Sequence, residues 1–318
     1  MNTKLRYLLY MLRIRRVEFR IAEIPILVIP ILLLIHDTAP LRTFTFWEGI
    51  FVFFLLFAFG DMINCLADRD LDAVYKPHLS EAVYGLGVGF VKFQVIATAV
   101  LALALTAHLS WQLQRWSLLA LVAIGLLLAA AYSVQPVQLK GRGVAQLICL
   151  WLIIFVGPML FISMLIATLP SLAVLLFASA FGAVQMGIIL VNTAEDYPED
   201  LEARIKTTIV ALGLHRGIGL AFWLTALGAV GVLITLIVML RQRSAESIWM
   251  WAVVPAAVAC IYVLADVWKL KGAIVKQDLA AAIQTVKRTA RRVPVWLTVV
   301  AWSVLSTAYA IFLAGRNN

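Results

Sequence analysis

The sequence predicts an all-helical, polytopic membrane protein with nine transmembrane helices. Hydrophobic residues make up 63% of the 318 residues and charged residues only 14%, a composition that excludes an ordinary soluble fold. Most of the long apolar runs approach the roughly 20 residues that a helix needs to cross a bilayer. The segments between these runs differ sharply in basic residues, as do the two sides of a membrane protein.

The first expected span is Ile21–Ile35, which contains two prolines and carries Glu23 near its cytoplasmic end. Glu23 fits either a structural ion pair or a role in a site. Before this span, residues 1–20 form a basic amphipathic segment that we expect to lie on membrane lipids. No cleavage site is evident after the apolar run, so the first span is expected to be retained. The other spans are expected at Trp47–Leu66, Gly87–Leu109, Trp116–Tyr132, Val144–Thr168, Ser171–Val191, Gly217–Leu240, Ile248–Trp268 and Val293–Leu313.

The distribution of basic residues predicts the orientation of these spans. With the N-terminus inside and the C-terminus outside, all but five of the 26 Lys and Arg residues lie in cytoplasmic segments. The net charge of +9 is therefore assigned to cytoplasmic loops, and no nucleic-acid partner is expected. We expect the protein to lie in the inner membrane of a prokaryote. The basic residues on the outer side are Arg42, Arg115, Arg241, Arg243 and Arg316.

An acidic cluster closes the second apolar run at Asn64–Asp72. Residues four apart share a helix face, so Asn64, Asp68 and Asp72 are expected to project the same way. Like charges at this spacing repel unless a cation lies between them, and Mg²⁺ binds carboxylates while bridging to phosphates. A solvated acidic loop is the alternative for a single cluster. Asp61, one turn earlier, is a candidate for a deeper base.

The same Asn-x3-Asp-x3-Asp pattern recurs where the apolar run Ser171–Val191 ends, at Asn192, Asp196 and Asp200. Chance repetition of a solvated loop rarely preserves residue type, spacing and placement together. The offset of four spans indicates an internal repeat of four-helix bundles. We therefore predict two facing carboxylate sets that hold metal ions and a polyanion between them. The acids on other faces, expected to be solvated, are Asp70, Glu195 and Glu199.

Basic residues accompany both acidic clusters on the predicted cytoplasmic side. The loop after the fourth span begins at Tyr132 and carries Lys140 and Arg142. Lys and Arg side chains donate charge-assisted hydrogen bonds to phosphate oxygens, so acids and bases together predict a diphosphate site. For Arg142 the alternative is an ordinary basic loop, and for Tyr132 an interfacial anchor. Other basic residues near the acids are Lys76, Arg204 and Lys206.

A further basic segment, Lys271–Arg292, has apolar residues interleaved with its charges. It is predicted to be either a surface helix on anionic lipid or a lid over the site. The three cysteines lie in or beside apolar runs without metal-ligand spacing and are expected to be buried thiols.

Taken together, the motifs resemble those of the UbiA superfamily of intramembrane prenyltransferases. The resemblance covers nearly the whole chain and implies one transmembrane prenyltransferase domain over residues 1–318, with helices around a central cavity open to lipid. The helix-and-loop segments 47–80 and 171–208 would carry the two Asp-rich motifs. Departures at Cys65 and after Lys76 leave the acceptor open. The matching signatures are Asn64-x3-Asp68-x3-Asp72, Tyr132-Ser-x2-Pro136-x2-Leu139-Lys140, and Asp196-x3-Asp200 followed by Lys206-Thr207 and Leu212-Gly213.

The resemblance implies Mg²⁺-dependent transfer of an isoprenoid group from an allylic polyprenyl diphosphate to a lipophilic or aromatic acceptor. The aspartates would coordinate Mg²⁺ as catalytic residues, Lys140 would bind the leaving diphosphate, and the asparagines would bind metal or orient carboxylates. The implied metal ligands are Asp68, Asp72, Asp196, Asp200, Asn64 and Asn192. The implied diphosphate-binding residues are Asn64, Lys76, Tyr132, Lys140, Arg142, Asn192 and Lys206.

Three alternatives stay open at this point. A terpene cyclase would keep the fold and quench the allylic cation internally, without an acceptor. A polyprenyl-phosphate phosphoribosyltransferase would use a sugar diphosphate instead. A transporter is less favoured, because its polar groups are expected at the bilayer midplane, whereas these acids cluster at helix ends on one side.

Overall fold

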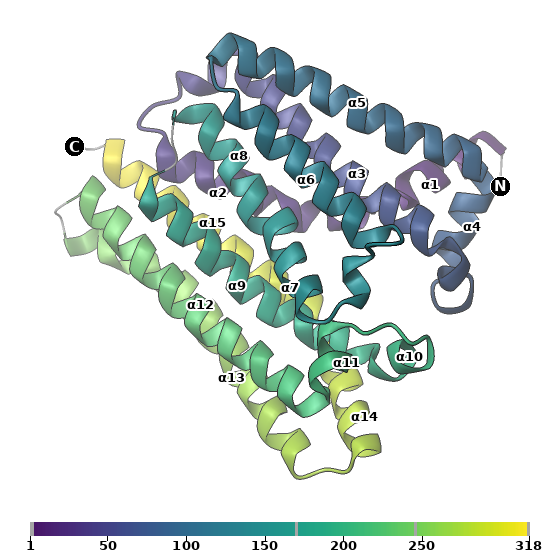
Figure 1. Ribbon diagram of the computed structural model, residues 1–318. Coiled ribbons are helices and arrows are strands. Elements are labelled where there is room, and N and C mark those ends of the chain that lie inside the picture. The colour runs from purple at the N-terminus through teal and green to yellow at the C-terminus, as the bar shows by residue number, and fades with distance from the viewer. Residues whose placement is uncertain (1–2, 169–170, 245–246, 317–318) are drawn as a thin grey trace. The chain divides into compact units, whose positions relative to one another are not determined.

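The computed structural model describes residues 3–168, 171–244 and 247–316, and every regular element in these ranges is a helix (Figure 1). The expected all-helical membrane fold is thereby confirmed. Within the described ranges, seven helical stretches are long and apolar enough to span a membrane, so the expected count of nine is not confirmed. These stretches are Phe44–Tyr75, Val88–Leu113, Val144–Ile166, Leu172–Glu195, Leu214–Arg243, Trp249–Val275 and Val293–Arg316.

The other two expected spans form helices that are short. Helix α2 (Arg20–Leu34) has 15 residues and α6 (Ser117–Ser133) has 17. At about 1.5 Å per residue, 15 residues extend only about 22 Å. The hydrocarbon core of a bilayer is about 30 Å thick, which explains why length separates these two helices from the other seven.

The chain divides into two compact units that are not contiguous in sequence. The first runs to Glu23 and continues from Leu41 to Leu139, and the second contains Ile24–Pro40 and the chain from Lys140 onward. The boundary between them falls inside α2, so the first turn of this helix belongs to the first unit and the rest to the second.

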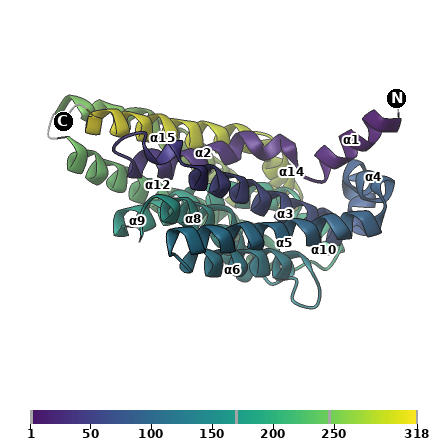
Figure 2. The ribbon, with the colours of Figure 1, turned by 90° about the horizontal axis from the view of Figure 1, so that it is seen from above.

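In the first unit, α3 (Phe44–Tyr75), α5 (Val88–Leu113) and α6 pack against one another, and they lie side by side in Figures 1 and 2. Helix α4 (Pro77–Leu86) packs against α3, and the amphipathic helix α1 (Thr3–Arg13) packs against α4. The Tyr10 ring lies so close to Gly85 that a Cβ on Gly85 would be 2.3 Å from it. Leucines on another face of α1 remain exposed, namely Leu5, Leu8 and Leu12.

The second unit is organised around α9 (Leu172–Glu195) and α12 (Leu214–Arg243). Two glycines allow their backbones to approach closely: a Cβ on Gly187 would lie 2.7 Å from the carbonyl of Ala221, and one on Gly228 would lie 2.6 Å from the amide of Val184. Small residues are the usual means of close helix packing in membranes. Besides α2, the other helices of this unit are α7 (Val144–Leu150), the π-helical η4 (Trp151–Val156), α8 (Gly157–Ile166), α10 (Tyr197–Glu202), α11 (Thr208–Leu212), the 3-10 helix η5 (Ser247–Val253), α13 (Val254–Val275), α14 (Leu279–Ala290) and α15 (Val293–Arg316).

Arg243, at the end of α12, binds the free carbonyls at the C-terminal end of α2. Its guanidinium donates hydrogen bonds to the carbonyls of Leu33 at 2.8 Å and Ile35 at 2.9 Å, and it lies 2.9 Å from His36 Nδ1. The last carbonyls of a helix have no partner within the helix, so a side chain that reaches them replaces water. The end of α2 is therefore fixed within the second unit by one arginine.

Candidate functional site

The first acidic motif lies on one continuous helix. Because α3 extends to Tyr75, it carries Asn64, Asp68 and Asp72 at successive turns, and the expectation of a shared face agrees with this geometry. Asp72 is buried, whereas Asn64 and Asp68 are half-buried. The helix continues about two turns beyond the expected span, so the motif belongs to its last turns and not to a loop.

A sharp break follows the motif and returns the chain toward α3. The Lys76 amide donates to the Asp72 carbonyl at 2.8 Å, and Pro77 then begins α4. The Tyr84 hydroxyl of α4 donates to the carboxylate of Asp70, which also pairs with Arg69 at 3.3 Å. This hydrogen bond raises the pKa of the Tyr84 phenol, because an ionised tyrosine would lose it beside a negative charge. Asp70 is exposed, as expected, and helps to hold α4 against α3.

The second acidic motif is built differently. Asn192 lies exposed in the last turn of α9, which ends at Glu195. Asp196 occupies the break, and α10 begins at Tyr197 with Pro198 in its first turn. The Asp200 amide donates to the Asp196 carbonyl at 2.8 Å, so the two aspartates are one turn apart. We call Asp196–Asp200 the acidic turn.

The predicted basic residues of the second unit lie on two backbone segments that pair with each other. Arg142 and Lys206 form an isolated parallel bridge, and the Gly143 amide donates to the Lys206 carbonyl at 2.7 Å. Gly143 has a φ of +59°, a conformation that favours glycine. The Ile205 amide donates to the Asp200 carbonyl at 2.8 Å, which ties this pairing to the acidic turn.

The buried side chains of Gln146 and Thr208 stabilise the pairing between the segments of Arg142 and Lys206. The Gln146 amide oxygen accepts hydrogen bonds from the Thr208 backbone amide at 2.8 Å and from the Thr208 hydroxyl at 3.1 Å. The same hydroxyl lies 2.8 Å from the Gly143 carbonyl, to which it can also donate. Lys140 is 8% exposed despite its charge, while Arg142 and Lys206 are exposed. The second unit thus joins three cations to the acidic turn through backbone contacts.

The predicted site residues are divided between the two units. The first unit contains Asn64, Asp68, Asp72, Lys76 and Tyr132, of which Lys76 is exposed and Tyr132 is half-buried at the end of α6. The second contains the acidic turn and the three cations described above together with Asn192.

The donor chemistry of both sets fits Mg²⁺. Each set offers two carboxylates and one amide, which are hard oxygen ligands, and Cys65 next to Asn64 is buried with a free thiol. In the described ranges no group of three or more His, Cys, Asp or Glu side chains is arranged to hold a metal ion. Mg²⁺ usually keeps several waters and takes one or two carboxylates plus substrate phosphates, so two aspartates per set suit this mode of binding.

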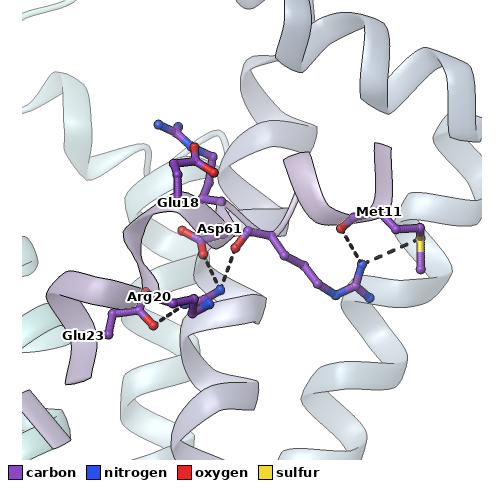
Figure 3. Close-up of polar contacts among 7 residues, drawn as sticks. Met11, Glu18, Arg20, Glu23 and Asp61 are labelled. Carbon is purple, nitrogen blue, oxygen red and sulfur yellow. Dashed lines mark hydrogen bonds and ion pairs between the residues drawn. The ribbon is translucent and has the colours of Figure 1, made fainter. Parts of the chain in front are cut away.

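Sequence reasoning did not identify the arginine that forms ion pairs with two acids near the first motif. Figure 3 shows Arg20 between Glu23 and Asp61. One guanidinium nitrogen donates to Asp61 at 2.9 Å and another contacts both carboxylate oxygens of Glu23. Asp61 lies one turn before Asn64 on α3 and shares Arg20 with Glu23 as its ion-pair partner. The only sequence signal was the three-residue spacing of Arg20 and Glu23, which places them on one helix face.

Glu199 has a partner that sequence reasoning did not identify. It was expected to be solvated; its side chain is 32% exposed, and it also accepts a hydrogen bond from Lys287 Nζ at 2.7 Å. The two residues are 88 positions apart, and no local pattern could have connected them.

The chain belongs to the UbiA prenyltransferase family, whose sequence profile matches residues 24–277. A search among curated proteins finds no match. With the helices described above, this membership makes the chain an integral, multi-pass membrane protein.

Solved structures show the same fold at low sequence identity. One comes from a study of digeranylgeranylglyceryl phosphate synthase in membranes, with 15% identity and a TM-score of 0.68, covering 95% of this chain and 99% of the other. A UbiA homologue from Archaeoglobus fulgidus bound to DMAPP and Mg²⁺ has 19% identity and a TM-score of 0.61, covering 93% and 99%. A UbiA homologue from the same organism bound to GPP and Mg²⁺ has 18% identity and a TM-score of 0.58, with the same coverage.

Proposed function

We propose that this protein transfers an isoprenoid group, in a Mg²⁺-dependent reaction within the membrane, from an allylic polyprenyl diphosphate to a lipophilic or aromatic acceptor. The observation that carries the proposal is the repeated Asn-x3-Asp-x3-Asp pattern at the polar ends of α3 and α9 in a chain of this family. The A. fulgidus homologue with DMAPP or GPP and Mg²⁺ supports the donor class.

In this proposal the carboxylates of both motifs hold the metal ions, and the two asparagines bind metal or orient the carboxylates. Bound Mg²⁺ would neutralise the negative charge that develops on the departing diphosphate. The residues assigned to metal binding are Asp68, Asp72, Asp196, Asp200, Asn64 and Asn192.

The basic residues complete the binding of the leaving group. Lys140 is nearly buried, so its ammonium is less hydrated and interacts more strongly with a phosphate than an exposed lysine would. Arg142 and Lys206 add charge-assisted hydrogen bonds from the paired segments. Lys76 and Tyr132 are assigned the same role from the first unit.

The reaction breaks the allylic C–O bond of the donor and forms a bond from the allylic carbon to a carbon or oxygen of the acceptor. The acceptor loses a proton, and diphosphate leaves with the bonding electrons. Stabilising the diphosphate lowers the barrier, because that group gains charge in the transition state. The apolar helices would hold the isoprenoid tail away from water. We place the site on the cytoplasmic side of a prokaryotic inner membrane, following the charge of the loops.

The test uses purified protein in lipid nanodiscs with radiolabelled farnesyl and geranylgeranyl diphosphates and a panel of phenols, quinone-precursor acids and lipid alcohols. We expect a prenylated product with Mg²⁺ and none with chelator. Asp68→Asn and Asp196→Asn should each reduce turnover by about 10² to 10³-fold, the range seen when one stabilising group of a transition state is removed.

Matched controls are available on the same elements. Asp70→Asn makes the same chemical change on another face of α3, and Glu202→Gln removes an exposed charge from α10. Both should keep the wild-type rate. A hydrocarbon or alcohol formed without acceptor would indicate a cyclase. Folded protein that consumes no prenyl diphosphate would refute the proposal, and activity with a ribosyl diphosphate would then indicate the sugar transfer.

A further inference from the structure

Helix α14 is held against α9 and α13, close to the acidic turn (Figure 1). The Asp278 side chain caps its first turn by accepting a hydrogen bond from the Ala281 amide at 2.8 Å. Its buried residues recur at every fourth position, which gives one apolar face: Ala282, Val286 and Ala290. The helix therefore has a defined rotation, and Lys287 follows directly after a buried residue.

Lys287 contacts the acidic turn through Glu199. Its ammonium donates to Glu199 Oε1 at 2.7 Å, and the two side chains are 35% and 32% exposed. The second carboxylate oxygen of Glu199 is buried and has no hydrogen-bond partner in the described part of the chain. Glu199 lies immediately before Asp200 and three residues after Asp196, so a contact that fixes Glu199 also limits the movement of both aspartates.

The charge of the acidic turn reaches Lys287 beyond this one contact. The hydrogen bond to Glu199 raises the pKa of Lys287, and the charges of Glu199, Glu195 and Asp196 raise it further. Arg291 at the end of α14 also interacts electrostatically with Glu195. The basic end of α14 therefore balances an acidic segment that would otherwise repel itself.

A tertiary contact is needed here because α10 has only six residues. Helices this short are not stable by themselves in water. The backbone hydrogen bond from the Ile205 amide to the Asp200 carbonyl and the Lys287 contact with Glu199 both hold the first turn of α10.

We infer that Lys287 is a positioning residue, which holds the acidic turn through Glu199 in the geometry that binds the metal and the donor diphosphate. This inference rests on the proposed function and assigns α14 to the site, although α14 carries none of its expected ligands.

The experiment compares Lys287→Gln with Arg288→Gln in the full-length protein in nanodiscs. Arg288 is the exposed neighbour on the same helix, so the control removes the same charge without the contact. Hydrogen–deuterium exchange without substrates should show at least about tenfold faster exchange of the α10 amides in Lys287→Gln and no change in Arg288→Gln. The apparent affinity for Mg²⁺ in the transfer assay should fall about 10- to 100-fold in Lys287→Gln, as it does when supporting partners of metal ligands are removed.

Two further variants sharpen the result. Lys287→Arg keeps the charge and should restore both readouts most of the way. Glu199→Gln should reproduce the exchange change, and the double variant should be no worse than either single one, because both remove the same contact.

Equal exchange and equal Mg²⁺ dependence in Lys287→Gln and Arg288→Gln would overturn the inference. If the wild-type protein transfers no isoprenoid, the proposed function fails, but the exchange experiment still decides whether Lys287 holds the acidic turn.

Discussion

Replacing Gly187 by alanine should separate α9 from α12 and destabilise the protein. The new Cβ would lie 2.3 Å from Thr225 Oγ1 and 2.7 Å from the Ala221 carbonyl, whereas ordinary contact begins at 3.4 Å. The Thr225 hydroxyl can rotate away, but the carbonyl cannot, so the backbones must move apart by roughly 0.7 Å, the difference between 3.4 and 2.7. Overpacking of this kind costs about 1–3 kcal/mol of unfolding free energy.

A glycine on α12 supplies the control. Gly219 has no atom within 4 Å of its added Cβ, so Gly219→Ala meets no obstacle. Alanine favours a helix over glycine by about 0.5–1 kcal/mol, and this variant should therefore be neutral or more stable. Unfolding in SDS, followed by circular dichroism, measures both effects. If Gly187→Ala unfolded at the same SDS fraction as Gly219→Ala, the close contact between α9 and α12 would not contribute to stability.

Three further predictions concern the contacts of the second unit. Arg243→Met should lower the unfolding free energy by about 2–4 kcal/mol, because the carbonyls of Leu33 and Ile35 lose charge-assisted hydrogen bonds. In the same SDS titration, replacing the exposed Arg241 by Met should change it by less than about 0.5 kcal/mol. Gln146→Leu removes the oxygen that accepts the hydrogen bond of the Thr208 amide. Because this loosens the segment that contains Lys206, the KM for the prenyl diphosphate should rise about two- to tenfold, and an unchanged KM would contradict the role of Gln146 in holding that segment. Chelation with EDTA should abolish prenyl transfer and excess Mg²⁺ should restore it, so a rate that survives EDTA would exclude the metal-dependent reaction.

The helices were largely predictable because apolar runs in a bilayer must satisfy their backbone internally. Each of the nine expected spans is helical, but length distinguishes α2 and α6 from the others. The four-residue spacing of Asn64, Asp68 and Asp72 predicted a shared helix face, whereas the expected span ended at Leu66 because the charged residues that follow do not belong in a bilayer.

The difference between the two acidic motifs has a local cause that the sequence contains. Pro198 has no amide hydrogen to donate to the carbonyl four residues earlier, so it is tolerated only in the first turn of a new helix, and the first motif has no proline at the matching position. The second copy therefore breaks at Asp196, while the first continues as a helix.

The supporting contacts of the candidate site were not predictable. The pairs Gln146 with Thr208 and Lys287 with Glu199 join residues 62 and 88 positions apart. A single sequence reports which residue types are present and their local spacing, but not which distant side chains meet. The ligand types could thus be proposed from the motifs, whereas the residues that hold them in place required the structure.

The contact between Arg243 and the end of α2 imposes an order on biogenesis. Arg243 follows Ile35 by 208 residues, so at a synthesis rate of about 5–20 residues per second the arginine is made roughly 10–40 s after the helix it closes. Throughout that interval the carbonyls of Leu33 and Ile35 must be bonded by water or lipid headgroups, which keeps this end of α2 at the polar boundary of the membrane. In the nascent chain the end of α2 therefore lacks its arginine partner, and the second unit cannot complete its assembly until α12 has been inserted.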